Sequence, residues 1–218
     1  MFKKIISIFL ILSFLSYGFW MEFEPAVVIA ATETTSTIVV SLQVTNEVAM
    51  TCGTTVSMSP SIGGYSGGTA NGTATCNVTS TGAYHIALNA TGSPALIHRT
   101  LGSGTNFANY TPSTANVPDY TWSVAGTAAE FGYTISSTKP ATVFKNDGGA
   151  CNAGSNNPDG SKCWLNASTT PVTVISDTDN SGSHIVAHYF KFQAESGTSN
   201  VQPQGWYDAT IKITATAD

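Results

Sequence analysis

Apolar and polar residues alternate with a period of two along much of the chain after residue 36. In residues 37–45, one face carries Ile38, Val40, Leu42 and Val44, and the opposite face carries Val39, Ser41 and Gln43. Such alternation is typical of a half-buried β-strand. The same pattern predicts further strands at residues 48–52, 73–79, 84–90, 120–124, 131–137, 172–176, 184–193 and 207–217.

Turn-forming residues separate these runs. Glycine pairs and Asn-Gly or Asp-Gly steps occur at Gly63-Gly64, Asn71-Gly72, Asp147-Gly148 and Asp159-Gly160. Short strands punctuated in this way, with no helical pattern between them, predict an all-β protein of the antiparallel sandwich type. Residues 145–170 form one long irregular stretch, which we expect to be an insertion loop on the rim of the sandwich.

Composition excludes several classes of function. Charged residues make up 10% of the chain, and the net charge is −5 with a sequence pI of about 5.2. A polybasic surface for nucleic acid or anionic lipid is therefore not expected. Hydrophobic residues at 42% are sufficient to build a core.

The N-terminus has the order of a secretory signal peptide. A basic start with Lys3 and Lys4 precedes an apolar run of 16 residues, 5–20, and small residues follow at Ala30 and Ala31. The run is shorter than the roughly 20 residues that a membrane-spanning helix needs, which favours cleavage over a permanent anchor. We therefore expect residues 1–31 to be removed, leaving a single exported domain, 32–218, with no membrane segment.

Four cysteines lie in this exported part. Proximity along the chain favours the pairs Cys52–Cys76 and Cys151–Cys163, the second of which would close the insertion loop. A zinc site is the competing interpretation, but no C-x-x-C spacing is present and exported proteins meet an oxidising environment. We expect two structural disulfides, each worth about 3 kcal/mol.

The motifs that resemble catalytic sites lack their required context. Residues 64–68 match G-x-S-x-G, but a nucleophile elbow places its serine between a strand and a helix, and both flanks here are turn-like. No pair of carboxylates stands out for acid–base chemistry. We expect no enzyme activity, no catalytic residue and no cofactor.

Metal binding is considered at two places. Asp177-Thr178-Asp179-Asn180 resembles the opening of a calcium loop, although strands flank it and an Asx-rich turn explains the same residues. His184 and His188 point the same way on a strand, but spacing places no third ligand beside them. We expect no metal site, and a calcium ion in the hairpin remains the weaker alternative.

Aromatic residues offer a second kind of binding face. Trp122, Trp164, Trp206, Tyr120 and Tyr207 would line a sugar-binding surface if they were exposed together. Packing in the core or across strands is the favoured interpretation.

Three features of the chain resemble a known family. They are the alternating segment 37–44 followed closely by Cys52, the Cys52 and Cys76 pair around a glycine-rich stretch with the strand after it, and the ending from Pro203 to Thr214. Together they resemble the spore coat protein U family and the related archaic chaperone–usher pilus subunits. Residues 145–170 depart from that pattern, as does the position of Asp208, one place early.

The resemblance implies an immunoglobulin-like, pilin-like sandwich that lacks one strand. An N-terminal donor strand within residues 32–46 would complete the sheet of a neighbouring subunit, with Ile38, Val40, Leu42 and Val44 as its inserting side chains. The alternation alone fits equally well with a first strand of the same monomer. We therefore expect a cell-surface structural or adhesive subunit that assembles into a pilus or coat, with itself, other surface subunits and a secretion chaperone as partners. The alternative is a monomeric surface module that binds carbohydrate.

Overall fold

A computed structural model describes residues 38–180 and 182–218. The expected signal peptide, residues 1–31, lies outside the described residues, as do residues 32–37 of the expected donor segment. The chain divides after Gln43, and the unit Val44–Asp218 holds every strand of the described residues. In the described part no helix is long and apolar enough to span a bilayer.

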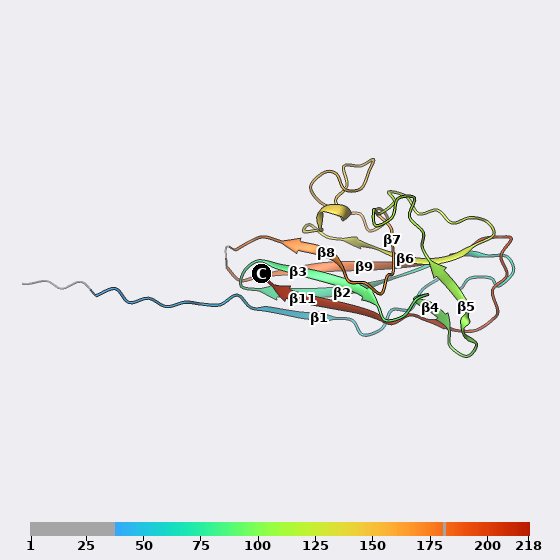
Figure 1. Cartoon of the computed structure of the whole chain (residues 1–218), viewed down its shortest axis with the longest axis horizontal. Coiled ribbons are helices and arrows are strands. Elements are labelled where there is room, and N and C mark those ends of the chain that lie inside the picture. The colour runs from blue at the N-terminus through green and yellow to red at the C-terminus, as the bar shows by residue number, and fades with distance from the viewer. Residues whose placement is uncertain (1–37, 181) are drawn as a thin grey trace, which may run out of the picture. The chain divides into compact units, whose positions relative to one another are not determined.

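The second unit is built almost entirely from strands (Figure 1). In chain order the strands are β1 (Val48–Cys52), β2 (Gly68–Ser80), β3 (Tyr84–Ala90), β4 (Leu96–His98), β5 (Gly102–Asn109), β6 (Ala129–Ser136), β7 (Leu165–Asn166), β8 (Val172–Asp177), β9 (His184–Ser196), β10 (Tyr207–Asp208) and β11 (Ile211–Ala217). One short 3-10 helix, η1 (Thr142–Phe144), precedes the long irregular stretch. The prediction of an all-β protein is confirmed.

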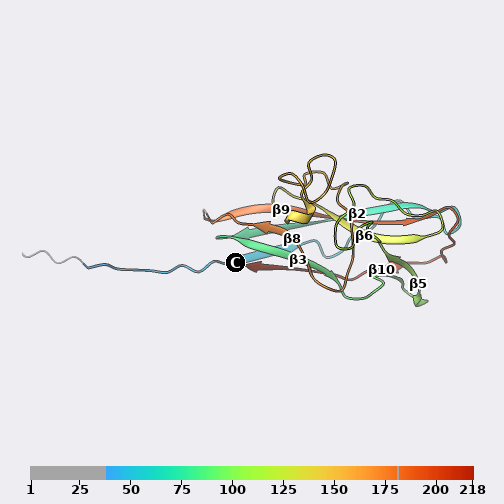
Figure 2. The same ribbon diagram turned by 45° about the horizontal axis from the view of Figure 1, so that its top comes forward.

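The strands form two sheets, which lie one over the other in Figure 2. The larger has the order β1-β2-β9-β6-β5-β4-β10, with β7 added beside β6, and the smaller has the order β11-β3-β8. All strand pairs are antiparallel except β5 with β6. These two strands run parallel, with Ala108 opposite Glu130 and Asn109 opposite Phe131. The expected antiparallel pattern is therefore corrected at this one pair. The immunoglobulin-like arrangement of the strands stays a prediction.

Both sheets contribute to one hydrophobic core, because each strand turns alternate side chains inward. On β3 the inward residues Tyr84, Ile86 and Leu88 are at most 1% exposed, and Phe190 of β9 is fully buried. Because the side-chain period of a strand is two, a register slip of one residue would expose this whole set. The apolar alternation seen in the sequence therefore fixes which face of each strand meets the core.

The irregular stretch 145–170 is only partly a rim loop. Cys151 and Cys163 are disulfide-bonded across it, as expected. Beyond the disulfide, Trp164 and Leu165 are 1% and 2% exposed, and β7 pairs with Gly132 and Tyr133 of β6. The stretch therefore contributes to the core and to the large sheet, because its end carries large apolar side chains that need cover.

Other strand predictions have mixed outcomes. Those for β1 and β3 are confirmed at both ends, and those for β2, β8 and β9 are confirmed with extensions. The strand predicted at 131–137 is β6, which begins two residues earlier and ends one residue earlier. The predicted strand 207–217 is divided into β10 and β11, and β4, β5 and β7 had no prediction. Residues 120–124 are not a strand, so that prediction is wrong. No strand covers residues 38–47, so β1 is the first strand of the described chain.

Candidate functional site

The segment before β1 exposes its apolar face. Ile38, Val40, Leu42 and Val44 are 82%, 88%, 89% and 80% exposed. Folded proteins usually bury side chains of this kind, and full burial of each stabilises by about 1.5–3 kcal/mol. The described chain therefore carries an exposed apolar face with the period of a strand.

Two sheet edges of the second unit are also incomplete. Among the described residues β1 pairs only with β2, and β11 pairs only with β3, so the other edge of each strand has no strand partner. The two strands lie side by side in Figure 1 and approach each other in space. Unpaired edges present rows of backbone N–H and C=O groups that can pair with another strand.

Inward side chains along these two edges are covered only in part. On β1 these are Val48, Met50 and Cys52, and on β11 they are Ile211, Ile213 and Ala215, all of which pack against the core while keeping intermediate exposure. Inward residues of the central strands, such as Ile86 and Phe190, are 0% exposed. The core is therefore least covered between β1 and β11.

The exposed segment and the open edge agree in length. From Ile38 to Val44 an extended chain covers about 20 Å, as does β11 from Ile211 to Ala217, at about 3.3 Å for each residue. Both present apolar side chains at every second position. One strand with the period of 38–44 would therefore match the free edge of β11 along its whole length.

The second unit holds the chain firmly from Asn46 onward. The Asn46 side chain donates a hydrogen bond to the Ala83 carbonyl, and the Glu47 backbone N–H donates to Thr81 Oγ1 at 2.8 Å. The disulfide Cys52–Cys76 then joins directly opposed residues of β1 and β2, as the sequence predicted. The edge strand β1 is thus fixed at both of its ends.

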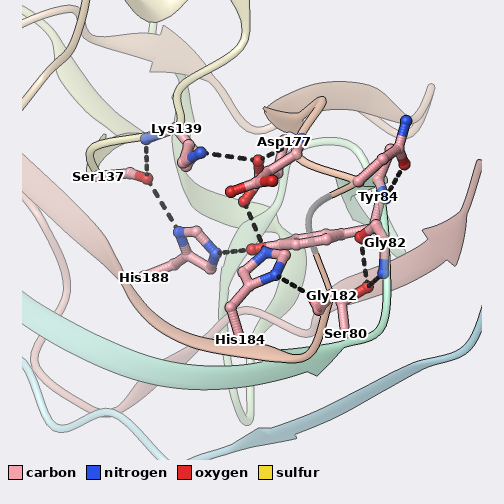
Figure 3. Close-up of polar contacts among 12 residues, drawn as sticks. Ser80, Gly82, Tyr84, Ser137, Lys139, Asp177, Gly182, His184 and His188 are labelled. Atoms are coloured by element: carbon pink, nitrogen blue, oxygen red, sulfur yellow. Dashed lines mark hydrogen bonds and ion pairs between the residues drawn. The ribbon is translucent and has the colours of Figure 1, made fainter.

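A buried polar network joins the start of β3, the end of β8 and the start of β9 (Figure 3). Asp177, at the end of β8, is fully buried and accepts hydrogen bonds from Lys139 Nζ at 2.9 Å and His184 Nε2 at 3.1 Å. Although burial by itself raises the pKa of this carboxyl group, the bonds from Lys139, from the Asp179 backbone and from His184 hold it below its ordinary value. Asp177 is therefore an ionised anchor between two cationic groups.

The two histidines of β9 lie in opposite electrostatic environments. His184 places Nδ1 3.0 Å from the Gly182 carbonyl and Nε2 near the Asp177 carboxylate. Both neighbours are acceptors, so this site favours the protonated ring, which donates from both nitrogens. The bond to the Gly182 carbonyl and the nearby carboxylate accordingly raise the pKa of His184.

His188 is fully buried and neutral. Its Nε2 lies 2.8 Å from the Tyr84 hydroxyl and its Nδ1 lies 2.9 Å from Ser137 Oγ. Burial lowers the pKa of His188 to about 4, against a smaller opposing effect of Asp177. Its two neutral partners give it hydrogen bonds but no compensating charge.

This network uses the carboxylate and one of the histidines that the sequence offered as metal ligands. The Asp177 carboxylate is already neutralised by Lys139 and His184, and Ser181 lies outside the described residues. No group of three metal-ligating side chains occurs in the described ranges. The sequence identified the shared face of His184 and His188, but Tyr84, Ser137 and Lys139 gave no recognisable pattern because they come from other parts of the chain.

The G-x-S-x-G residues form a tight hairpin. Gly63 and Gly67 exchange two backbone hydrogen bonds of 3.2 and 3.0 Å, and Gly67 has a positive φ of 68°. In the described structure no helix follows Ser66 and no hydrogen bond joins it to a histidine. The hairpin therefore does not have the geometry of a nucleophile elbow.

The aromatic residues do not gather on one face. Trp122 stacks on Tyr110 with ring centroids 4.3 Å apart and meets Trp164 edge-on, so these rings pack as the sequence favoured. Trp206, by contrast, is 74% exposed and lies under the guanidinium of Arg99. The alternative interpretation, a single sugar-binding face lined by all five aromatic residues, is therefore wrong.

Comparison with protein-family models and with curated proteins finds no match. The resemblance to spore coat and pilus subunits, argued from short motifs, stays a prediction.

Proposed function

We propose that this protein is an exported structural or adhesive subunit of the cell surface that assembles by β-strand exchange. Residues 38–44 of one copy would pair with the free edge of β11 of a second copy, beside β1. The inserted Ile38, Val40, Leu42 and Val44 side chains would cover the core where it is least covered. Backbone hydrogen bonds supply affinity in such strand addition, and alternate side chains set the register.

The observation that carries the proposal is the pairing of two incomplete features in one chain. An apolar strand face is exposed in residues 38–44, and an apolar edge of matching length is open at β11. Each feature alone would promote aggregation. Together they are complementary, because the segment has an apolar face to bury and the edge has unpaired backbone groups and partly exposed core residues to cover. Two disulfides among the described residues support an oxidising, extracytoplasmic environment.

A monomeric carbohydrate-binding module is the second candidate. It is favoured by Trp206, a large aromatic side chain that stays 74% exposed. The two candidates differ in whether the purified protein forms multimers, which makes the state of assembly the decisive measurement.

The test compares Val40→Asp with Val39→Asp in the exported full chain. Both residues are more than 80% exposed, but Val40 belongs to the proposed inserting face and Val39 to the opposite face. Only Val40→Asp would bury an unpaired carboxylate on assembly, and this burial would destabilise the multimer. We expect the wild type and Val39→Asp to form multimers that persist in SDS without heating, and Val40→Asp to be monomeric by light scattering.

A synthetic peptide of residues 37–45 provides a second measurement. Added during assembly, it should compete for the open edge and shorten the multimers, whereas a peptide carrying the Val40→Asp change should not. A stable wild-type monomer, or equal assembly of the two aspartate variants, would contradict strand exchange.

A further inference from the structure

Exposed large hydrophobic side chains gather at one end of the second unit. Outside residues 38–44, the described examples are Tyr65, Leu101, Ile185, Tyr189, Val201 and Trp206. Four of these six lie in three neighbouring loops, 63–67, 99–102 and 197–206. In Figure 1 the strands β4 and β5, which flank residues 99–101, lie at the end of the sheets away from the C-terminus.

Hydrogen bonds hold the three loops against one another. The Gln202 backbone N–H donates to the Gly64 carbonyl at 2.8 Å, and the Arg99 backbone N–H donates to the Trp206 carbonyl at 2.8 Å. The Tyr207 hydroxyl donates to Gln202 Oε1 at 3.1 Å. The exposed side chains are therefore presented from a connected platform, here called the loop platform.

Buried His98 organises the centre of the loop platform. Its Nδ1 accepts hydrogen bonds from the backbone N–H groups of Thr100 and Leu101, and its Nε2 donates to the Gln204 carbonyl at 3.1 Å. Gly205 has a φ of 151°, and a Cβ placed there would lie 2.3 Å from His98 Nε2. Trp206 is thus displayed by a preformed backbone, which lowers the ordering cost of binding.

Trp206 keeps one face of its ring open. The Arg99 guanidinium carbon lies 5.7 Å from the ring centroid and covers one face, while the side chain as a whole is 74% exposed. Arg99 is itself fixed by two bonds to Asp208, of 2.6 and 2.8 Å. The exposed indole therefore lies beside a guanidinium–carboxylate pair.

The chemistry of the loop platform suits an uncharged, hydroxyl-rich ligand. Arg99 is the only charged residue in loops 63–67, 99–102 and 197–206, and Asp208 neutralises it. The remaining residues are mainly glycine, serine, threonine, asparagine and glutamine, a mixture that with tyrosine and tryptophan also serves in antibody combining sites. The C–H face of a pyranose ring carries weak positive charge and stacks on the negative face of an indole.

We propose that the loop platform binds a neutral hexopyranose polysaccharide, with Trp206 as the stacking residue and Tyr65 as a second contact. A protein partner fits less well, because standard interfaces need roughly 800 Å² on each side around a closely packed apolar centre. Here most residues of the three loops are glycine or small polar residues, and only four exposed side chains are large and hydrophobic. The inference specifies the adhesive part of the proposed function, and it does not depend on strand exchange.

The experiment measures retention of the full exported chain on insoluble cellulose, on chitin and on mannan coupled to agarose. Trp206→Ala and Tyr65→Ala are compared with Tyr189→Ala, which removes an aromatic side chain that is 44% exposed on β9. We expect at least one polymer to retain the wild type and Tyr189→Ala, and Trp206→Ala to bind it at least about tenfold more weakly. Unchanged thermal unfolding of Trp206→Ala verifies that its fold is intact.

The same measurement on Val40→Asp separates this inference from strand exchange. If that variant is retained on the polymer, the inferred binding site stands even if the protein proves monomeric. Three results would overturn the inference: no retention of the wild type on any of the three polymers, equal retention of Trp206→Ala and Tyr189→Ala, or equal retention on polystyrene beads that carry only serum albumin. The last result would indicate a general apolar surface for proteins.

Discussion

Lowering the pH from 7 to 4.5 is expected to weaken the fold through His188. This histidine is fully buried and neutral, and its pKa is about 4 in the folded chain against an ordinary value of 6.5. In the unfolded chain the ring takes up a proton as the pH falls through 6.5, whereas in the folded chain it stays neutral until about pH 4. Acid therefore favours the unfolded state throughout this window.

The magnitude follows from linkage between protonation and folding. One extra proton bound by the unfolded chain lowers the free energy of unfolding by about 1.4 kcal/mol for each pH unit. Between pH 7 and pH 4.5 the His188 contribution is about 2 kcal/mol, from the difference between the two pKa values. Such a loss is a large fraction of the roughly 5–15 kcal/mol that stabilises a typical domain.

The other groups of the network act outside this window or in the opposite direction. The pKa of His184 is raised, so its contribution is fully present below pH 6.5 and is lost as the pH rises through the folded value. The pKa of Asp177 is lowered, so its contribution is present above its ordinary value of 3.8 and is lost only in stronger acid. Tyr84 and Ser137, which bond directly to His188, stay neutral between pH 4.5 and 7.

Urea unfolding at a series of pH values, followed by tryptophan fluorescence, measures this effect. His188→Gln keeps a polar side chain but cannot titrate, so its stability should fall about 2 kcal/mol less than that of the wild type between pH 7 and 4.5. Ser137→Ala is the matched control, because it removes a partner of His188 and leaves the ring able to titrate. Equal pH dependence in the wild type and His188→Gln would refute the reasoning.

Two further predictions concern stability. Asp177→Asn leaves Lys139 next to an uncharged partner and should lower the free energy of unfolding by about 2–3 kcal/mol, measured by thermal unfolding. Asp147→Asn, at an exposed turn, is the control and should have a much smaller effect; equal effects would contradict the anchoring role of Asp177. Gly197→Ala places a Cβ 2.2 Å from a backbone carbonyl oxygen and should cost about 1–3 kcal/mol, while Gly104→Ala, which has open space around it, should be nearly neutral in urea unfolding; a stable Gly197→Ala would show that the loop moves aside.

Local alternation was sufficient to predict the strands that build the core. The bounds of β1 and β3 were predicted correctly because each strand carries its own period-two pattern. The disulfide pairing also followed from proximity in the chain. In both cases the information lies within a few neighbouring residues.

Short or bent elements were not predictable in this way. β4, Leu96–His98, has three residues and exists through its pairing with β5 and β10. Residues 120–124 have a strand-like pattern, yet Trp122 stacks on Tyr110 and donates a hydrogen bond to Glu195 at 2.7 Å. Packing partners far along the chain decided the local conformation in both places.

The sequence by itself determined an all-β chain, two disulfide pairs and the apolar face of residues 38–44, because composition, spacing and period are local properties. Only the tertiary structure decided that β1 and β11 have open edges, that Asp177 meets Lys139 and His184, and that Trp206 is displayed beside Arg99. Each of these features joins residues from separate strands and loops. Their meeting depends on the order and register of the sheets, and the free energy that sets that register is summed over the whole core.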